Sequence, residues 1–301
     1  MGRSGVLAKA AEILRGAGHN LTIAPTAGPG TATEIAREHV SAGADLILAA
    51  GGDGTINEVA EGLVHTQVPL GILPGGTANV LATELGLGSG LVKAARRLEE
   101  FRPHRISVGH VTCREGAVSR HFLLMVGVGL DAHIVYHVSL PLKARTGKLS
   151  YWVAGWGMLG RRLAQFEVDL RGQRTTSSFA LVSKVRNYGG DLEIARDVTL
   201  FDDYFEVILF EGNSALPYVK YLAGVMLNRL HGMKGVVISR AECVTFSGPH
   251  DERIYVQVDG EFLGPLPAHV KVVPDALTIL VPEKYVRAHS RRTAEVDCDA
   301  R

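Results

Sequence analysis

Apolar residues in the first third of the chain recur with two different spacings, which predict alternating helices and strands. Helical spacing predicts helices over 5–18, 32–41, 55–64 and 78–85, and continuous apolar runs predict strands over 20–24, 46–50 and 67–73. Such an alternation is typical of a parallel sheet, because consecutive parallel strands need a crossover that is usually a helix. We therefore predict an α/β fold for the N-terminal part.

From residue 106 onward the pattern changes mainly to that of strands. They are predicted at 106–108, 122–128, 179–185, 205–209, 256–258 and 270–272. An antiparallel sandwich or a barrel-like domain fits this series of short strands. The stretch Arg102–Arg105 separates the two patterns. The predicted domains are 1–105, 106–282 and a helix with a tail at 283–301.

Composition narrows the class of protein. The chain has 301 residues, 46% of them hydrophobic, which is enough for two domains with sizeable cores. Its net charge of +1 gives no overall attraction to nucleic acid. The uncharged run 149–160 has twelve residues, which is too short to span a bilayer, and no signal peptide opens the chain. Three well-separated cysteines match no metal or redox spacing and favour a reducing cytoplasm.

A glycine-rich turn precedes the third predicted helix and is a candidate anion site. Gly51, Gly52 and Gly54 allow a sharp turn and the close approach of a ligand. Thr55 and Glu58 have the spacing of a capping box, which predicts that the helix begins at Thr55. Free N–H groups and the positive end of a helix dipole attract anions such as phosphate. An ordinary turn without a ligand is the alternative.

Asp53 lies within this turn and indicates that the anion would not bind alone. A carboxylate would repel bare phosphate, so a divalent cation or a proton is expected between them. A second turn, Pro74–Asn79, repeats the same order of strand, glycines and a threonine, Thr77, as predicted helix cap. Because the carboxyl ends of parallel strands face the same crevice, we expect the two turns to converge.

The most suggestive stretch of the second domain is Asp259-Gly260-Glu261, where two carboxylates flank a glycine. In a tight turn both could face one cleft, and phosphoryl transfer to an alcohol needs a carboxylate that positions the hydroxyl group and accepts its proton. Asp-Gly is also the commonest signal of a plain hairpin. From the residues alone the hairpin is favoured.

The string Gly-Gly-Asp-Gly-Thr-Ile-Asn-Glu at 51–58 closely resembles the nucleotide loop of the diacylglycerol kinase catalytic domain family. That family includes bacterial lipid kinases and the sphingosine and ceramide kinases. NAD kinases and 6-phosphofructokinases share the shorter GGDG core, so Thr55, Asn57 and Glu58 favour the lipid kinases. The resemblance implies a doubly wound parallel sheet of the NAD kinase and phosphofructokinase type, a mainly antiparallel β-sandwich, and a C-terminal helix that packs back on the first domain.

The resemblance also implies roles for individual residues. Those implied for ATP binding are Thr26, Gly51, Gly52, Asp53, Gly54, Thr55, Asn57, Glu58, Gly76 and Thr77. Those implied for the substrate are Asn79 and Asp131. Glu261 is implied as the general base, with Asp259 as the alternative or partner. A structural Mg²⁺ is implied at Asp202 and the carbonyl groups of Thr199 and Tyr204, although two adjacent aspartates before a strand more often mark an exposed turn.

Three features depart from the family pattern. The family begins with a strand that ends in a loop close to Asn-Pro-x-x-Gly, whereas this chain begins with a helix. Val80 stands where many members have an acidic residue. Phe201 and Asp203 replace the usual aspartate and glycine of the magnesium loop. These departures bear on nucleotide binding, on substrate specificity and on the metal loop.

The predicted function is that of an ATP-dependent lipid kinase. It would transfer the γ-phosphate of ATP, with Mg²⁺ as cofactor, to a lipid hydroxyl group, by default from diacylglycerol to phosphatidic acid; a sphingoid base or ceramide would fit as well. The alternatives are a soluble-substrate kinase of the NAD kinase type and a nucleotide- or lipid-binding protein without catalysis.

Partners and location follow from this prediction. ATP, a lipid with a free hydroxyl group and a second copy of the chain in a homodimer are expected, and nucleic acid is not. Residues 143–162 combine cations with an aromatic, amphipathic stretch that could rest on the inner face of a membrane. Such a stripe more often belongs to a core, and the protein is otherwise expected in the cytoplasm.

Overall fold

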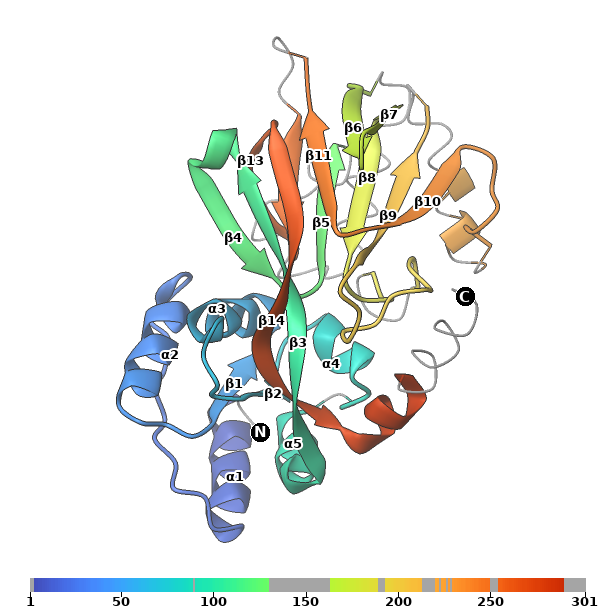
Figure 1. Ribbon diagram of the computed structural model, residues 1–301. Coiled ribbons are helices and arrows are strands. Elements are labelled where there is room, and N and C mark those ends of the chain that lie inside the picture. The colour runs from blue at the N-terminus through green and yellow to red at the C-terminus, as the bar shows by residue number, and fades with distance from the viewer. Residues whose placement is uncertain are drawn as a thin grey trace. The chain divides into compact units, whose positions relative to one another are not determined.

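The computed structural model describes residues 3–88, 90–129, 163–188, 193–212, 220–221, 223–225, 227, 229–249 and 254–289 (Figure 1). The chain forms two compact units, one of residues 1–107 and 275–301 and the other of residues 108–274. Two long strands, β3 (Phe101–Cys113) and β14 (Ala268–Pro282), each continue from one unit into the other. Because β14 ends beside a strand of the first unit, the second unit ends at Pro274, before the boundary at 282 expected from the sequence.

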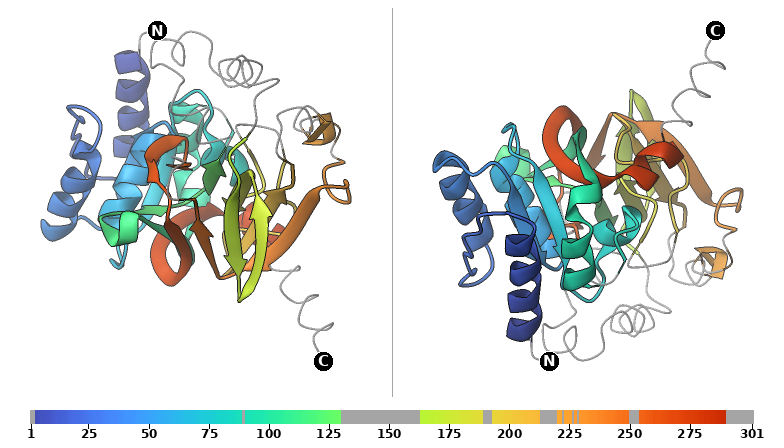
Figure 2. Two further views of the ribbon diagram at one scale, coloured as in Figure 1. Left: turned by 90° about the horizontal axis from the view of Figure 1, so that it is seen from above. Right: turned by 90° about the horizontal axis from the view of Figure 1, so that it is seen from below.

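The first unit contains a parallel sheet with helices around it. Strands β1 (Ile47–Gly51) and β2 (Leu70–Pro74) pair from Ile47 and Leu70 to Gly51 and Pro74, and Ile279 of β14 is parallel to β2. The helices are α1 (Arg3–Gly16), α2 (Thr31–Ser41), α3 (Asp53–Leu63), α4 (Val80–Glu84) and α5 (Leu91–Arg96), with η1 (Leu98–Glu100) and helical residues at 283–289. Helices α1 and α5 lie side by side (Figure 2). The predicted α/β fold is therefore confirmed.

Burial explains why these segments form a core. All five residues of β2 are buried, as expected for a strand in the middle of a covered parallel sheet. Ile56, Ala60 and Leu63 recur at helical spacing on α3 and are also buried. A glycine, Gly62, lets α3 approach α2, since a Cβ atom there would lie 2.6 Å from the carbonyl oxygen of Thr33.

The strand predicted over 20–24 is wrong. This segment has no regular secondary structure and no strand pairing among the described residues, and Ile23 is 50% exposed. Its apolar side chains, Leu21 and Ile23, are too few to bury a face of a strand. The other strands and helices predicted for the first unit are present, with ends shifted by a few residues.

The second unit is built from antiparallel strands in two sheets. One sheet has the order β10-β9-β8-β5-β12-β13, and in the other β14 is followed by β11, β6 and β7, with β3 paired to β4. The bounds are β4 (Val118–Phe122), β5 (Met125–Gly129), β6 (Phe166–Leu170), β7 (Gln173–Ser177), β8 (Phe179–Ser183), β9 (Phe205–Phe210), β10 (Val236–Ala241), β11 (Cys243–Ser247), β12 (Tyr255–Val258) and β13 (Glu261–Pro265), with η2 (Arg114–Gly116) after β3.

Side chains from both sheets share one core. Val126, Val182 and Val207 of one sheet belong to the same buried cluster as Phe246 and Val270 of the other. Two sheets with alternate residues directed inward are the mark of a β-sandwich. The mainly antiparallel sandwich predicted for this part of the chain is therefore confirmed.

Candidate functional site

The first glycine turn lies at the carboxyl end of β1. Helix α3 begins at Asp53, and its N-cap is Gly52 in an extended conformation, without a side-chain cap. The predicted helix start at Thr55 is therefore wrong. The first N–H groups of an α-helix have no acceptor inside the helix, so those at the start of α3 remain available to an anion.

Glu58 explains why the predicted capping box does not form. Its carboxylate accepts the N–H groups of Gly30 at 2.8 Å and Ala32 at 3.1 Å, at the start of α2. The hydroxyl group of Thr33 donates to the Glu58 carbonyl oxygen at 2.8 Å. A carboxylate at the positive end of the α2 dipole is favourable. Glu58 therefore ties α2 to α3.

The second turn is closed by Asn79. Its side-chain oxygen accepts the N–H group of Gly76 at 2.8 Å, and its amide group donates to the Gly76 carbonyl oxygen at 2.9 Å. Asn79 is in the left-handed conformation at φ 47° and is followed by α4, which begins at Val80. The helix cap predicted at Thr77 is therefore wrong. The residue before α4 is Asn79, whose side chain makes two hydrogen bonds to the backbone of Gly76.

The two turns meet, as the sequence predicts. The N–H group of Gly75 donates to the Gly51 carbonyl oxygen at 2.8 Å. A Cβ atom on Gly76 would lie only 2.5 Å from the Cα atom of Gly52, which no side chain tolerates without a backbone shift. Asp53 links the turns further, since its carboxylate accepts the N–H group of Leu81 at 3.4 Å. The result is a bare backbone surface beside the start of α3.

The remaining residues implied for the nucleotide differ in exposure. Thr26 lies in the exposed segment between α1 and α2, and Thr77 is exposed at the second turn. Gly54 and Thr55 are partly exposed in the first turn of α3. Asn57 is only 5% exposed and belongs to the core of the first unit.

In the second unit, Asp259 and Gly260 form the two-residue turn between β12 and β13. Both have positive φ angles, 49° and 81°, as expected for a hairpin turn of this length. The Asp259 carboxylate accepts three backbone N–H groups, those of Leu123 and Leu124 at 3.2 Å and of Met125 at 2.8 Å. Asp259 therefore braces the connection between β4 and β5.

Glu261 has a different partner. Its carboxylate accepts a hydrogen bond from Arg120 at 2.7 Å, with 43% of the Glu261 side chain exposed. The two carboxylates of the Asp-Gly-Glu turn thus have separate roles: Asp259 accepts backbone N–H groups, and Glu261 pairs with the Arg120 cation while it is partly exposed to solvent. Arg120 gave no signal in the sequence, because a single arginine in β4 looks like any exposed strand residue.

The implied magnesium loop is a turn closed by its own hydrogen bonds. The Asp202 carboxylate accepts the N–H group of Thr199 at 2.7 Å and its hydroxyl group at 2.8 Å. The N–H group of Asp202 donates to the Thr199 carbonyl oxygen at 3.2 Å. Tyr204 donates its hydroxyl group to the carbonyl oxygen of Asp197 at 2.8 Å, and burial, followed by the charge of Asp202, raises the pKa of Tyr204 to about 12.

A lysine that the sequence analysis did not single out reaches this loop. Lys184 is 1% exposed, and its ammonium group donates to the carbonyl oxygen of Asp202. Burial lowers the pKa of Lys184 to about 8, against the effect of the nearby Asp202 and Asp203 carboxylates. Within the described residues, no three His, Cys, Asp or Glu side chains are placed to hold a metal ion. A divalent cation does not fit beside this ammonium group.

Glu206 is a second buried charged side chain that the pattern did not reveal. It lies in β9, is fully buried, and accepts the N–H groups of Arg196 at 2.9 Å and Asp197 at 2.6 Å. Its other oxygen lies 3.6 Å from Nε2 of His231. Burial raises the pKa of Glu206 and lowers the pKa of His231, so both are favoured in their neutral forms.

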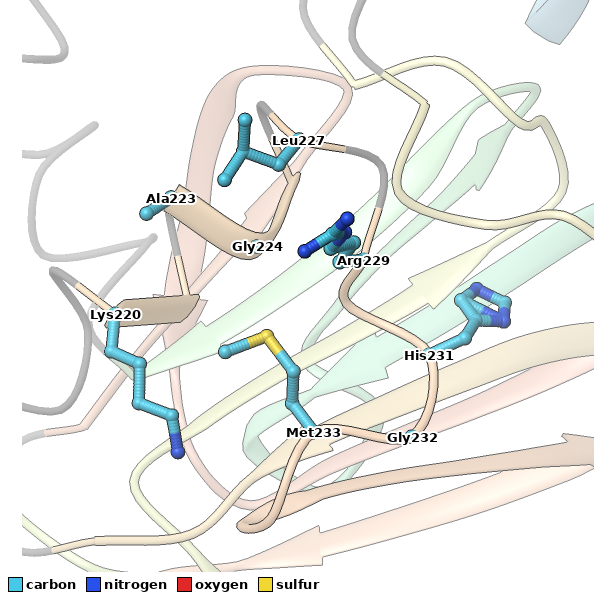
Figure 3. A pocket seen from close by; sticks show the side chains of 8 residues that line it. All are labelled: Lys220, Ala223, Gly224, Leu227, Arg229, His231, Gly232 and Met233. Carbon is cyan, nitrogen blue, oxygen red and sulfur yellow. The ribbon is translucent and has the colours of Figure 1, made fainter.

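His231 also lines a cavity of about 600 Å³ in the second unit (Figure 3). Lys220, Leu227, Arg229 and Met233 also line it. Among the described residues, none of those implied for nucleotide, substrate or metal lines this cavity. Some predictions from the sequence fall outside the described residues. These are the substrate role of Asp131 and the membrane contact of the aromatic stretch at 149–160 with its flanking cations. Of the described helices, none has the length and apolar character needed to cross a bilayer.

Two domain families match the chain. The diacylglycerol kinase catalytic domain matches residues 2–111, and the YegS C-terminal NAD kinase beta sandwich-like domain matches residues 124–281. A protein named diacylglycerol kinase from Bacillus subtilis is 28% identical over 288 residues, which cover 92% of this chain and 91% of that protein. One of the same name from Mycobacterium tuberculosis is 28% identical over 248 residues, covering 81% and 79%.

Solved structures show the same fold. A crystal structure of a diacylglycerol kinase from Bacillus anthracis aligns with a TM-score of 0.74 at 22% identity, covering 92% of this chain and 91% of that one. An NAD kinase from Archaeoglobus fulgidus, solved in complex with ATP, aligns with a TM-score of 0.53 at 13% identity, covering 94% and 92%. At such identities the likeness is one of fold alone.

Proposed function

The chain belongs to the diacylglycerol kinase catalytic domain family, and on that premise we propose that it is a kinase that transfers the γ-phosphate of ATP to the hydroxyl group of a lipid. The observation that carries the proposal is the meeting of the two glycine turns. A Cβ atom on Gly76 would lie 2.5 Å from the Gly52 Cα atom, and one on Gly52 would lie 3.3 Å from the Gly76 Cα atom, beside a helix start with unpaired N–H groups. This is the surface that a polyphosphate needs.

Phosphates on this surface would lie near Asp53, a carboxylate at the first residue of α3. Mg²⁺ that accompanies ATP as part of the substrate would reduce the repulsion between them. The N–H groups at the start of α3 would orient the phosphate oxygens, and the glycines would keep side chains out of the way. An NAD kinase of the same fold was solved in complex with ATP, which supports ATP as the nucleotide proposed for this chain.

We assign the general base to Glu261. As the hydroxyl oxygen bonds to the γ-phosphorus and the bond to the leaving ADP oxygen breaks, the hydroxyl proton would pass to the Glu261 carboxylate. Arg120 would hold that carboxylate in place through the 2.7 Å hydrogen bond. Asp259 is the weaker candidate, because three backbone N–H groups already occupy its carboxylate.

Diacylglycerol is the proposed acceptor, since the Bacillus subtilis and Mycobacterium tuberculosis relatives carry the name diacylglycerol kinase. The product would be phosphatidic acid. Because such an acceptor resides in a membrane, the proposed place of reaction is a membrane surface.

The test is transfer of labelled γ-phosphate from ATP, with Mg²⁺, to diacylglycerol, ceramide and a sphingoid base in mixed micelles, with NAD as a soluble acceptor. Glu261→Gln should lower kcat by about 10²–10⁴, the usual contribution of a general base. The matched control is Glu242→Gln, because Glu242 also pairs with an arginine, Arg171, but on an exposed surface. Labelled NAD without labelled lipid, or a Glu261→Gln variant as active as the control, would overturn the proposal.

A further inference from the structure

Lys184 is a buried cation that the proposed phosphoryl transfer does not use. It follows β8 directly, and its backbone N–H group donates to the Leu124 carbonyl oxygen at 2.8 Å, which fixes the residue beside β5. Its side chain is 1% exposed. Lysine is almost never buried to this extent unless its charge has partners.

The partners of this charge lie in the loop 197–204. The Lys184 ammonium group donates to the carbonyl oxygen of Asp202, and the carboxylates of Asp202 and Asp203 are close enough to favour its charged form. The loop is folded toward the core, since Val198, Thr199 and Leu200 are all buried. One positive charge thus lies where carbonyl and carboxylate oxygens of a single loop gather.

A divalent cation would organise such a loop in the same way, by drawing carboxylate and carbonyl oxygens together. An ammonium group does so with three N–H donors and one charge. The two cannot share the position, because two cations at such close range repel each other and compete for the same oxygens. The Asp202 carboxylate is moreover turned back on Thr199, with which it makes two hydrogen bonds.

We propose that the Lys184 ammonium group occupies the place of a structural metal ion in the loop 197–204, so that this loop folds without Mg²⁺. The proposal concerns the architecture of the second unit and is independent of the proposed phosphoryl transfer. It also leaves untouched any Mg²⁺ that arrives with ATP, and for that reason its test excludes nucleotide.

The first measurement is thermal unfolding of the full chain without nucleotide, after treatment with a chelator and at increasing Mg²⁺ concentrations. The expected result is a Tm that changes by less than about 1 °C. A site filled at a hundred times its Kd would raise the Tm by roughly 4 °C or more. A saturable rise of that size that is lost or weakened in Asp202→Asn would overturn the proposal, whereas a Tm that stays constant in both proteins supports it.

The second measurement compares Lys184→Met with Lys220→Met, an exposed lysine of the same unit. Hydrogen exchange in the peptides covering 197–204 should accelerate at least tenfold in Lys184→Met and stay unchanged in Lys220→Met. Equal exchange in this loop for both variants would overturn the proposal. If Lys184→Met does not fold, the Mg²⁺ titration of the unsubstituted chain still decides.

Discussion

The two units build their polar turns in opposite ways. In the first unit, the turns after β1 and β2 meet as bare backbone, with Gly52 and Gly76 in close approach. In the second unit, carboxylates hold the turns, and both Asp259 and Asp202 accept backbone N–H groups. The first arrangement leaves donors uncovered for a ligand, whereas the second uses charge to fix the chain.

This difference separates two kinds of vulnerability. A backbone surface is damaged by adding an atom, because there is no room for it. A turn braced by a carboxylate is damaged by removing the charge, because its N–H groups lose their acceptor while they remain buried. The following variants test this contrast, beginning with the largest expected effect.

Removing the Asp259 carboxylate should be the most damaging change. Asp259→Ala leaves three backbone N–H groups without their acceptor and should lower the free energy of unfolding by about 3–6 kcal/mol. Asp259→Asn keeps one acceptor oxygen and tolerates the positive φ angle, so it should lose distinctly less. Urea unfolding measures both. Equal losses in the two variants would show that the carboxylate does not brace the turn.

Adding one carbon atom to the first unit should have the next largest effect. Gly76→Ala places a Cβ atom 2.5 Å from the Gly52 Cα atom and should cost about 1–3 kcal/mol as the backbone shifts. Since the shift alters the phosphate surface, ATP affinity should fall about tenfold or more, which corresponds to at least about 1.4 kcal/mol. Isothermal titration of ATP checks the affinity.

The neighbouring glycine is the matched control. In Gly75→Ala the nearest atom would be Leu91 Cδ1 at 3.5 Å, an ordinary contact. We expect unchanged ATP affinity and stability. If both alanine variants lose affinity alike, the close approach at Gly76 is not what shapes the surface.

Glu58 departs from the bare-backbone arrangement of the first unit, because its carboxylate braces the start of a helix. Glu58→Gln keeps one acceptor but loses the charge at the start of α2, so it should cost about 0.5–2 kcal/mol. Glu38→Gln, at an exposed position near the other end of α2, should cost nothing measurable. Chemical denaturation measures the stability of both variants. Equal stability of Glu58→Gln and Glu38→Gln would contradict the proposed role of the Glu58 carboxylate at the start of α2.

The last expected effect depends on pH and concerns Glu206. Because burial raises its pKa, the folded state binds a proton more tightly than the unfolded state does. Its contribution to stability is therefore present below the ordinary carboxyl pKa and is lost as pH rises through the raised value. The lowered pKa of His231 acts in the opposite direction, with stability lost as pH falls.

Glu206→Gln isolates this contribution, since His231 is present in both proteins. Between pH 4.5 and 7.5 the wild type should lose stability relative to Glu206→Gln, by at most about 1.4 kcal/mol per pH unit, the limit for one proton. Unfolding curves across this range provide the measurement. Parallel pH profiles for the two proteins would contradict the raised pKa.

Local patterns predicted much of this molecule, and their failures have a common cause. The glycine turns were predicted to converge, and they do, because the carboxyl ends of parallel strands share one edge of the sheet. The predicted capping box failed because Glu58 bonds to another helix, α2. The strand predicted over 205–209 is β9, but the pattern gave no sign that Glu206 in it is buried and accepts backbone N–H groups.

The sequence by itself determined the order of elements, the two kinds of sheet and the positions of the glycine and Asp-Gly turns, because these depend on neighbours along the chain. Only the tertiary structure decided the partner of each charge. Arg120 holds Glu261, Lys184 reaches the loop of Asp202, and Glu58 anchors α2. The physical reason is that a charged side chain gains most from partners that burial brings close, and those partners lie far away in the sequence.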